Sequence, residues 1–219
     1  TIVGKIKDIF KSETNSFVVE MPASSMIVEG TKEWLDLRLG LITCSEIKTI
    51  RADGAGAQTY INGLAYERIT GEPSKIFEGN GWTNRGHELE PIARDLYQQK
   101  TGHEVEEVSF IKNLGFGYSP DGLIGLDGAM EIKAKQPQVQ ISILRSGEIP
   151  KEHLDQLDGG LLCSNRNWID FIAYCPNLPI FIKRVYAEER KAQLEKLNTL
   201  IEKYNKQIDD VVNQIMEMY

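Results

Sequence analysis

Hydrophobic positions are most regular in the last part of the chain, from Ala187 onward. Apolar residues there alternate between spacings of three and four, at Leu194, Leu197, Ile201, Tyr204, Ile208, Val211, Ile215 and Met218. This spacing is typical of a helix with one apolar stripe, so it predicts a long C-terminal helix over residues 187–219. The stripe can pack on the protein's own body or on another helix, which we favour, or it can form a contact between subunits.

Shorter segments carry weaker patterns. Helical spacing of apolar residues predicts helices over Asn84 to Lys100, Tyr60 to Thr70 and Lys151 to Leu162. Runs of β-prone residues predict strands over Asn167 to Ala173 and Ile180 to Tyr186. Residues 1–30 are mixed in character, and we interpret them as an N-terminal extension.

A further pattern combines β-prone residues with charged ones. Gly117 to Ile124 is expected to form a short strand, and Ala129 to Ala134 is expected to return beside it as a hairpin. Leu126-Asp127-Gly128 would supply the turn. Because side chains alternate between the two faces of a strand, Glu131 and Lys133 should point to the same face.

The turn decides whether Asp121 joins these two residues. A two-residue turn at Asp127-Gly128 would direct Asp121 to the opposite face. A three-residue loop with Gly128 in the left-handed conformation would pair Asp121 with Lys133, and a bulge at Gly122 could have the same effect. We expect the convergent arrangement.

Convergence of these side chains would create a specific chemical site. Two crowded carboxylates, from Asp121 and Glu131, repel each other unless a cation lies between them. Hard oxygen ligands suit Mg²⁺ or Mn²⁺, and Lys133 beside them could orient a water molecule or offset charge on a phosphate. The pattern therefore predicts cleavage of phosphodiester bonds. Taken alone, the same residues could also form an ordinary turn and a solvated strand face.

Several segments, in the same order, resemble the lambda-exonuclease (YqaJ-like viral recombinase) family of the PD-(D/E)xK nuclease superfamily. The matching segments are Trp34 to Ile47, Gly86 to Arg94, Ser119 to Leu123 and Glu131 to Lys133, followed by Gln156. The resemblance covers roughly Trp34 to Leu162. One departure follows the lysine, where family members often have Cys-Pro and this chain has Ala134-Lys135.

The resemblance implies metal-binding and catalytic roles for specific residues. Asp121, Glu131 and the backbone carbonyl of Ile132 would hold one Mg²⁺ ion, for which Mn²⁺ can substitute. Glu90 would help to hold a second ion, which makes two ions per active site. Lys133 would orient the attacking water.

The resemblance also implies roles for other matched residues. Gln156 would assist catalysis near the attacking water. Arg38, Ser45 and Ser119 would form a pocket for a terminal 5′-phosphate.

The resemblance also implies an activity and a setting. Members of this family degrade one strand of duplex DNA from its 5′ end, and the best-studied ones are ring-shaped trimers. We therefore expect a Mg²⁺-dependent 5′→3′ exonuclease that converts linear duplex DNA to mononucleotides and leaves a 3′ single strand for recombination. A phage or prophage origin, a trimeric homo-oligomer and a single-strand annealing protein as partner are implied as well.

The phosphate pocket has a physical rationale of its own. Ser45-Glu46 looks like the start of a helix that Ser45 can cap. An arginine fork beside free N–H groups at a helix N-terminus binds phosphate well, which would be the role of Arg38. The alternative is that Arg38 pairs with Asp36 or Glu46 on the surface.

Glu90 and Gln156 also have ordinary alternatives. Glu90 lies four residues before Arg94, so the two could form a surface ion pair. Gln156 shares a helix face with Gly160, where the missing side chain would let a bulky group approach. Without the resemblance, Gln156 would be interpreted as a polar surface residue.

Length and cysteine content restrict the class of protein. A chain of 219 residues is long enough for one substantial domain, and we expect a single nuclease domain over residues 1–219. No stretch approaches about 18 uninterrupted apolar residues, and no secretory signal is visible, so no membrane association is expected. Cys44, Cys163 and Cys175 lie far apart without any Cys-x-x-Cys pairing. They are typical of a cytoplasmic protein and argue against a cysteine-held zinc or iron–sulfur site.

The net charge of −7 is unusual for a DNA-binding protein, because basic surfaces usually supply the affinity. A locally positive groove would resolve the conflict, and an acidic exterior would limit nonspecific binding. The candidates for this groove are Lys48, Arg51, Arg85, Lys133, Lys135 and Arg145.

Together these features predict an α/β, restriction-endonuclease-like core with a central mixed sheet of about five strands, flanked by helices. Two other functions remain open. One is an endonuclease of the same superfamily, of restriction or flap type, which would cut circular DNA. The other is a non-catalytic DNA-end-binding module that reuses the fold.

Overall fold

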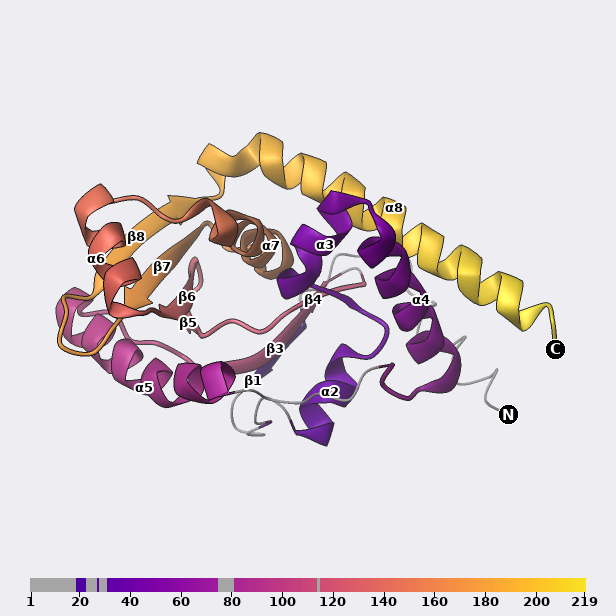
Figure 1. The fold of residues 1–219 in the computed structure, drawn as a ribbon, viewed down its shortest axis with the longest axis horizontal. Coiled ribbons are helices and arrows are strands. Elements are labelled where there is room, and N and C mark those ends of the chain that lie inside the picture. Colours follow the sequence, from indigo (N-terminus) through magenta and orange to yellow (C-terminus); the bar gives the residue numbers. More distant parts are fainter. Residues whose placement is uncertain (1–18, 23–26, 28–30, 75–80, 114) are drawn as a thin grey trace.

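The computed structural model describes residues 19–22, 27, 31–74, 81–113 and 115–219, and its mixed α/β fold confirms the predicted class (Figure 1). Most of the predicted extension over residues 1–30 lies outside the described residues. Within that range, Val19–Pro22 forms β1 and pairs with a later strand. No helix in the described part of the chain has the length and apolar character needed to cross a membrane.

The strands divide between two four-stranded sheets, instead of the single central sheet of about five strands that we expected. The first sheet has the order β1-β3-β4-β2, with β2 parallel to β4 and the other pairs antiparallel. Its remaining strands are β2 (Ile42–Thr43), β3 (Val108–Asn113) and β4 (Phe116–Tyr118).

The second sheet has the order β5-β6-β7-β8, with β6 parallel to β7 and the other pairs antiparallel. Its strands are β5 (Gly122–Ile124), β6 (Gly128–Ala134), β7 (Trp168–Tyr174) and β8 (Phe181–Tyr186). The chain passes from the first sheet to the second through Ser119-Pro120-Asp121. Proline has no N–H to donate to a strand ladder, which favours a break in pairing at this point.

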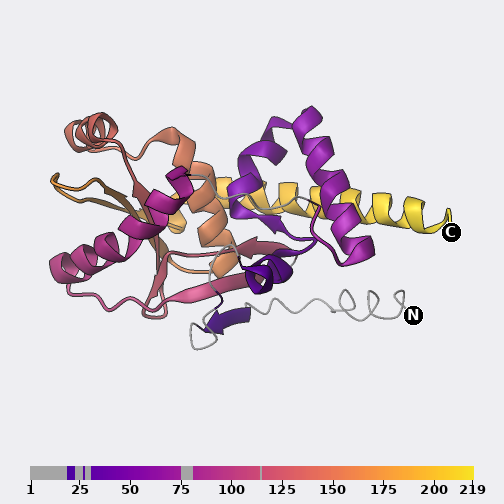
Figure 2. The ribbon, with the colours of Figure 1, turned by 60° about the horizontal axis from the view of Figure 1, so that its bottom comes forward.

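Helices cover both faces of the second sheet (Figures 1 and 2). The helix α5 (Gly81–Thr101) packs on one face of β6, where Met130 and Ile132 join a small core with Ala93 and Tyr97. The helix α7 (Leu154–Ser164) packs on the other face. Because residues of a strand alternate, Glu131 and Lys133 lie on the α7 side.

The long C-terminal helix α8 (Lys191–Met216) is confirmed and packs on the protein's own body. Its stripe residues Leu197, Ile201, Tyr204 and Ile208 are buried in the main core, whereas Ile215 and Met218 are exposed. Figures 1 and 2 both show α8 running beside α4 (Ala55–Thr70). The other elements are the helices α2 (Lys32–Arg38), α3 (Ile47–Ala52) and α6 (Pro137–Ser146), and the 3₁₀ turns Cys44–Glu46, Lys151–His153 and Glu188–Arg190.

Candidate active site

The strands β5 and β6 form the predicted hairpin, although its register differs from the predicted one. Gly122 lies opposite Met130, and the three-residue loop consists of Gly125, Leu126 and Asp127. Gly125 has a φ of 55°, so it takes the left-handed conformation that we had assigned to a later glycine. The loop therefore starts one residue earlier than predicted.

The loop starts earlier because Gly128 is part of β6, where it packs against another strand. A Cβ atom at Gly128 would lie 2.3 Å from the ring of Trp168, so this glycine is needed for close packing and not for the turn. The predicted pairing of Asp121 with Lys133 is wrong, because the observed register, continued by one residue, places Asp121 opposite Glu131. A shift of two residues keeps every side chain on its predicted face, so the carboxylates still converge.

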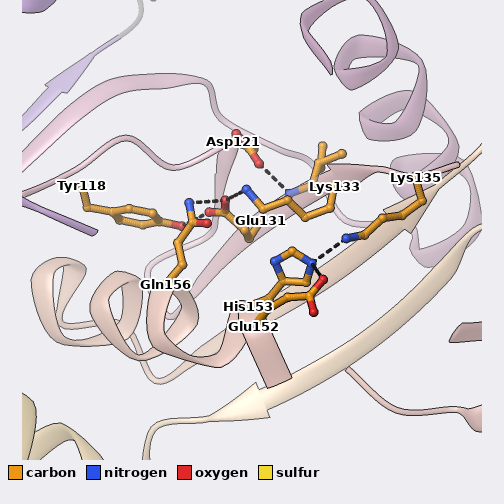
Figure 3. Close-up of polar contacts among 9 residues, drawn as sticks. Tyr118, Asp121, Glu131, Lys133, Lys135, Glu152, His153 and Gln156 are labelled. Atoms are coloured by element: carbon orange, nitrogen blue, oxygen red, sulfur yellow. Dashed lines mark hydrogen bonds and ion pairs between the residues drawn. The ribbon is translucent and has the colours of Figure 1, made fainter. Parts of the chain in front are cut away.

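Glu131 lies at the centre of this cluster and is only 2% exposed (Figure 3). Its Oε1 accepts hydrogen bonds from Nζ of Lys133 at 2.7 Å and from Nε2 of Gln156 at 2.6 Å. Its Oε2 accepts a hydrogen bond from the Tyr118 hydroxyl at 3.1 Å. Three donors on three different elements therefore fix the orientation of one carboxylate.

The side chain of Asp121 contacts β6, the strand that carries Glu131. Its Oδ2 accepts a hydrogen bond from the backbone N–H of Ile132 at 2.5 Å. Burial raises the pKa of Asp121 well above its usual value, and the negative charges of Glu131 and Glu90 raise it further. The charge of Lys133 and the N–H of Ile132 act in the opposite direction. Lys133 is paired with Glu131 and Arg94 with Glu90, so the carboxyl group of Asp121 has no cation of its own to offset its charge among the described residues.

This charge imbalance is the structural test for a metal. Among the described residues, no three His, Cys, Asp or Glu side chains lie close enough together to form a recognisable metal-binding group. The available oxygen donors are the carboxylates of Asp121 and Glu131 and the carbonyl of Ile132, with Glu90 close enough to affect the pKa of Asp121. Hard oxygen donors with excess negative charge fit a divalent cation such as Mg²⁺ or Mn²⁺.

Glu90 and Arg94 of α5 form the ion pair that their spacing suggested, at 2.5 Å between Oε1 and Nη2. Arg94 is only 9% exposed, however, and this pair is part of the site. Its Nε donates to the carbonyl oxygen of Asp121 at 3.1 Å, and its Nη1 lies 3.0 Å from Oε1 of Glu107. Arg94 therefore connects Glu90 on α5 to the backbone of Asp121 through an ion pair and a hydrogen bond.

Arg38 lies at the end of α2, with its guanidinium 3.9 Å above the ring of Trp34. Its Nη2 donates to Oγ1 of Thr43 at 3.3 Å, and Thr43 is in turn 3.2 Å from the hydroxyl of Ser45. The hydroxyl of Ser119 is buried and has no hydrogen-bond partner among the residues that the structure describes. A buried hydroxyl of this kind can donate to a bound water or ligand, and an anion held by Arg38 would supply such an acceptor.

The predicted helix start at Ser45 is wrong. Cys44–Glu46 forms a 3₁₀ turn, α3 begins at Ile47, and no side chain caps either element. The short turn arises because Thr43 still belongs to β2, which leaves only three residues before the helix. An anion at this place would therefore be held by side chains and not by a helix N-terminus.

One cavity of about 330 Å³ unites these groups. It is lined by every residue that we predicted for the site, namely Arg38, Ser45, Glu90, Ser119, Asp121, Glu131, Ile132, Lys133 and Gln156. Thr43 and Tyr118 also line it, and they were not assigned a role from the sequence. Thr43 could have been found, because it is part of the Trp34 to Ile47 segment that carries the resemblance.

Residues 33–167 match the sequence model of the YqaJ-like viral recombinase domain. The chain belongs to the YqaJ-like viral recombinase family. This confirms the resemblance that we identified over roughly Trp34 to Leu162. A search of curated proteins gives no match.

Solved structures agree with this family assignment. An alkaline exonuclease from Laribacter hongkongensis, LHK-Exo, is 31% identical, with a TM-score of 0.76 over 86% of this chain and 97% of that chain. The same exonuclease in complex with dAMP is 31% identical, with a TM-score of 0.72 over 86% of this chain and 100% of that one. A phage related exonuclease from Haemophilus somnus 129PT, at 16% identity, shares the fold, with a TM-score of 0.56 over 80% of this chain and 96% of that one.

The basic residues that we predicted for a groove have different surroundings in this family member. Lys133 lines the cavity, and Lys135 contacts His153 nearby. Arg51 is ion-paired with Asp155 at 3.3 Å, which offsets its charge. Lys48 and Arg145 are exposed, and the side chain of Arg85 lies outside the described part of the structure.

Proposed function

We propose that this protein is a metal-dependent exonuclease that degrades linear double-stranded DNA in the 5′→3′ direction and releases mononucleotides. The observation that supports it is the shared cavity, which joins a hydrolytic cluster at Asp121, Glu131 and Lys133 to an anion pocket at Arg38 and Ser119. A pocket for a terminal phosphate is useful to an enzyme that starts at DNA ends. The family and the exonucleases among its solved relatives support the same activity.

Each part of the cluster has a defined task in this proposal. A divalent cation held by Asp121, Glu131 and the Ile132 carbonyl, with Glu90 contributing to a second ion, would act as a Lewis acid on the phosphate. Lys133 would orient the attacking water with its ammonium group, which already lies 2.7 Å from Glu131. Gln156 would hold Glu131 in place through the 2.6 Å hydrogen bond.

The anion pocket would determine both polarity and product. With the terminal 5′-phosphate bound by Arg38, Ser45 and Ser119, the next phosphate of the strand would reach the hydrolytic cluster. The cavity of about 330 Å³ is of the size that holds a small ligand, in agreement with release of one nucleotide at a time. The dAMP complex of LHK-Exo supports a mononucleotide product.

The biological setting is also part of the proposal. A 3′ single strand left by the enzyme would serve recombination by strand annealing in the cytoplasm of a bacterial host, with an annealing protein as partner. A trimeric ring would hold the DNA during repeated cleavage. Light scattering tests the ring, and a monomer at micromolar concentration would contradict it.

Digestion of linear and closed-circular duplex DNA with Mg²⁺, one strand of the linear duplex being end-labelled, tests the function. We expect mononucleotides from the 5′ end of linear DNA, intact circles, and no digestion by Asp121→Asn or in the presence of a chelator. Cleavage of circles would instead indicate an endonuclease. DNA binding that survives Asp121→Asn, with no cleavage by the wild-type protein, would indicate an end-binding module.

A further inference from the structure

Beside the hydrolytic cluster lies a second basic group, formed by Lys135 and His153 (Figure 3). Nζ of Lys135 is 2.5 Å from Nε2 of His153. The ring of His153 stacks on Phe171 with 5.2 Å between the centroids, and its side chain is 15% exposed. The backbone N–H of Lys135, one residue past the end of β6, donates to the carbonyl of Tyr174 at 2.8 Å, which fixes the backbone of this lysine beside β7.

The state of His153 shows how this contact works. Burial lowers the pKa of His153 to about 3, and the charges of Lys135 and Lys133 contribute to the shift. A neutral imidazole can accept a hydrogen bond at Nε2, so Lys135 donates to it as an ammonium group. Stacking on Phe171 fixes the ring, and the ring in turn fixes the ammonium.

The positive charge of Lys135 is offset less by nearby acids than that of Lys133. Lys133 is paired with the buried carboxylate of Glu131 at 2.7 Å. Burial and the charge of Lys133 lower the pKa of Lys135, and the acid that raises it, Glu152, has a side chain that is 63% exposed. An approaching anion would be attracted to this pair of neighbouring lysines.

The position of Lys135 relative to the cavity indicates which phosphate it would meet. It is two residues beyond Lys133 and directly follows Ala134, which lines the cavity. Its contact with His153, in the turn before α7, places its ammonium on the α7 side of the sheet, where Lys133 also lies. In Figure 3, Lys135 and Tyr118 lie on opposite sides of Lys133 and Glu131. Two residues of a strand span roughly 6.6 Å, comparable with the separation of neighbouring phosphates in a DNA strand.

We infer that Lys135 binds the phosphate that follows the scissile one on the 3′ side, and that His153 is a positioning residue for its ammonium group. The inference rests on the proposed exonuclease function. If the terminal phosphate occupies the Arg38 pocket and the scissile phosphate lies at Lys133, the next phosphate lies beyond a cavity sized for one nucleotide. Lys135, the cation next to the cavity, would then contact that phosphate.

A neutral phosphate analogue tests this contact without changing the protein. We would digest 5′-phosphorylated duplexes that carry one methylphosphonate either at the second internucleotide linkage from the 5′ end or several linkages further along. For the wild-type enzyme, we expect the second linkage to raise KM for removal of the first nucleotide roughly tenfold, and the distant one to have little effect. An equal KM with both duplexes would overturn the inference.

Variants then assign the contact to Lys135. Lys135→Ala should raise KM by a similar factor with kcat little changed, lower the salt dependence of DNA affinity by about one phosphate contact, and lose sensitivity to the methylphosphonate. Lys135→Arg should restore most of the affinity, and His153→Phe, which keeps a ring on Phe171, should give an intermediate KM. Lys206→Ala is the matched control, because Lys206 is an exposed lysine paired with Asp210 on α8.

The outcomes separate the inference from the function on which it rests. Additive losses from Lys135→Ala and the methylphosphonate would show that they act on different contacts and would overturn the inference alone. A salt dependence equal to that of the wild type would do the same. Absence of end-dependent digestion by the wild-type protein would instead overturn the proposed function.

Discussion

Gly160 lies directly against the ring of Tyr118, because a Cβ atom on this glycine would be 2.9 Å from Cζ of the tyrosine. The missing side chain lets β4 approach α7, and the Tyr118 hydroxyl then reaches Glu131 at 3.1 Å. Gln156, one turn earlier on the same helix, donates to the other oxygen of that carboxylate. The sequence predicted that Gly160 admits a bulky group, and the structure identifies that group as Tyr118.

Gly160→Ala should therefore impair the site from a distance. The extra methyl group would push the Tyr118 ring away and shift Glu131, so we expect lower kcat and a loss of about 1–3 kcal/mol in the free energy of unfolding. Gly56→Ala is the control, because the nearest atom to its Cβ would be 3.9 Å away. That variant should be neutral or more stable by up to about 1 kcal/mol. Equal behaviour of the two variants in urea denaturation and turnover assays would contradict this account.

Arg94→Ala should weaken the connection between α5 and the hairpin. It removes the hydrogen bond to the Asp121 carbonyl and leaves Glu90 without its 2.5 Å partner. Since Arg94 is buried but its acidic partners are partly exposed, we expect a loss of about 2–3 kcal/mol in stability, together with reduced turnover. Lys32→Ala, which breaks the exposed pair with Asp36, should change stability by less than about 0.5 kcal/mol. The prediction fails if both variants melt at the wild-type temperature.

Ser119→Ala and Arg38→Ala should distinguish DNA ends. The Ser119 hydroxyl has no partner within the described residues, so its removal should leave stability unchanged. Both variants should raise KM for 5′-phosphorylated ends, by roughly tenfold or more for Arg38→Ala, and have little effect on 5′-hydroxyl ends. Lys206→Ala, which removes an exposed cation on α8, serves as the control. Equal losses on both kinds of end would exclude the phosphate pocket.

His153 should make stability depend on pH. Its pKa in the folded protein, lowered to about 3, lies below the usual value near 6.5, so the unfolded chain binds more protons between these values. The free energy of unfolding is unaffected by this group above about pH 6.5 and falls as pH drops toward 3. His153→Phe removes the effect, so its stability relative to wild type should improve between pH 8 and pH 5 by at most about 2 kcal/mol. Urea denaturation at the two pH values measures it, and an unchanged difference would exclude the titration.

The sequence was most informative where one short segment carries a whole feature. The periodicity of α8 sufficed to predict a long helix, because seven-residue spacing repeats over its length. Packing on the body was the favoured of two open possibilities, and the buried stripe residues bear it out. The residues around Asp121, Glu131 and Lys133 predicted the chemistry of the site but left two registers open, one of which would have put Asp121 on the other face. The convergent prediction survived the error in pairing because a shift of two residues in register preserves the face.

Features that depend on distant contacts could not be predicted. The true register depends on Trp168, which packs against Gly128 from another strand. The role of Arg94 depends on its hydrogen bond to the carbonyl of Asp121, 27 residues further along the chain. The pattern of apolar residues in α5 does not indicate this contact. The division into two sheets depends on how β4 and β5 separate at Pro120, whereas local propensity predicts only that both are strands.

Lys133→Ala should abolish hydrolysis and spare DNA binding. The ammonium of Lys133 lies 2.7 Å from Oε1 of Glu131, while Gln156 and Tyr118 continue to hold the same carboxylate after its removal. The structure around Glu131 should therefore persist. The variant should be slower in the chemical step, with kcat reduced by about 10²–10⁴-fold. Single-turnover digestion of a 5′-labelled duplex, beside an affinity measurement on the same DNA, separates the two steps. Turnover equal to that of Lys206→Ala would remove Lys133 from catalysis, and lost affinity would make it a substrate-binding residue instead.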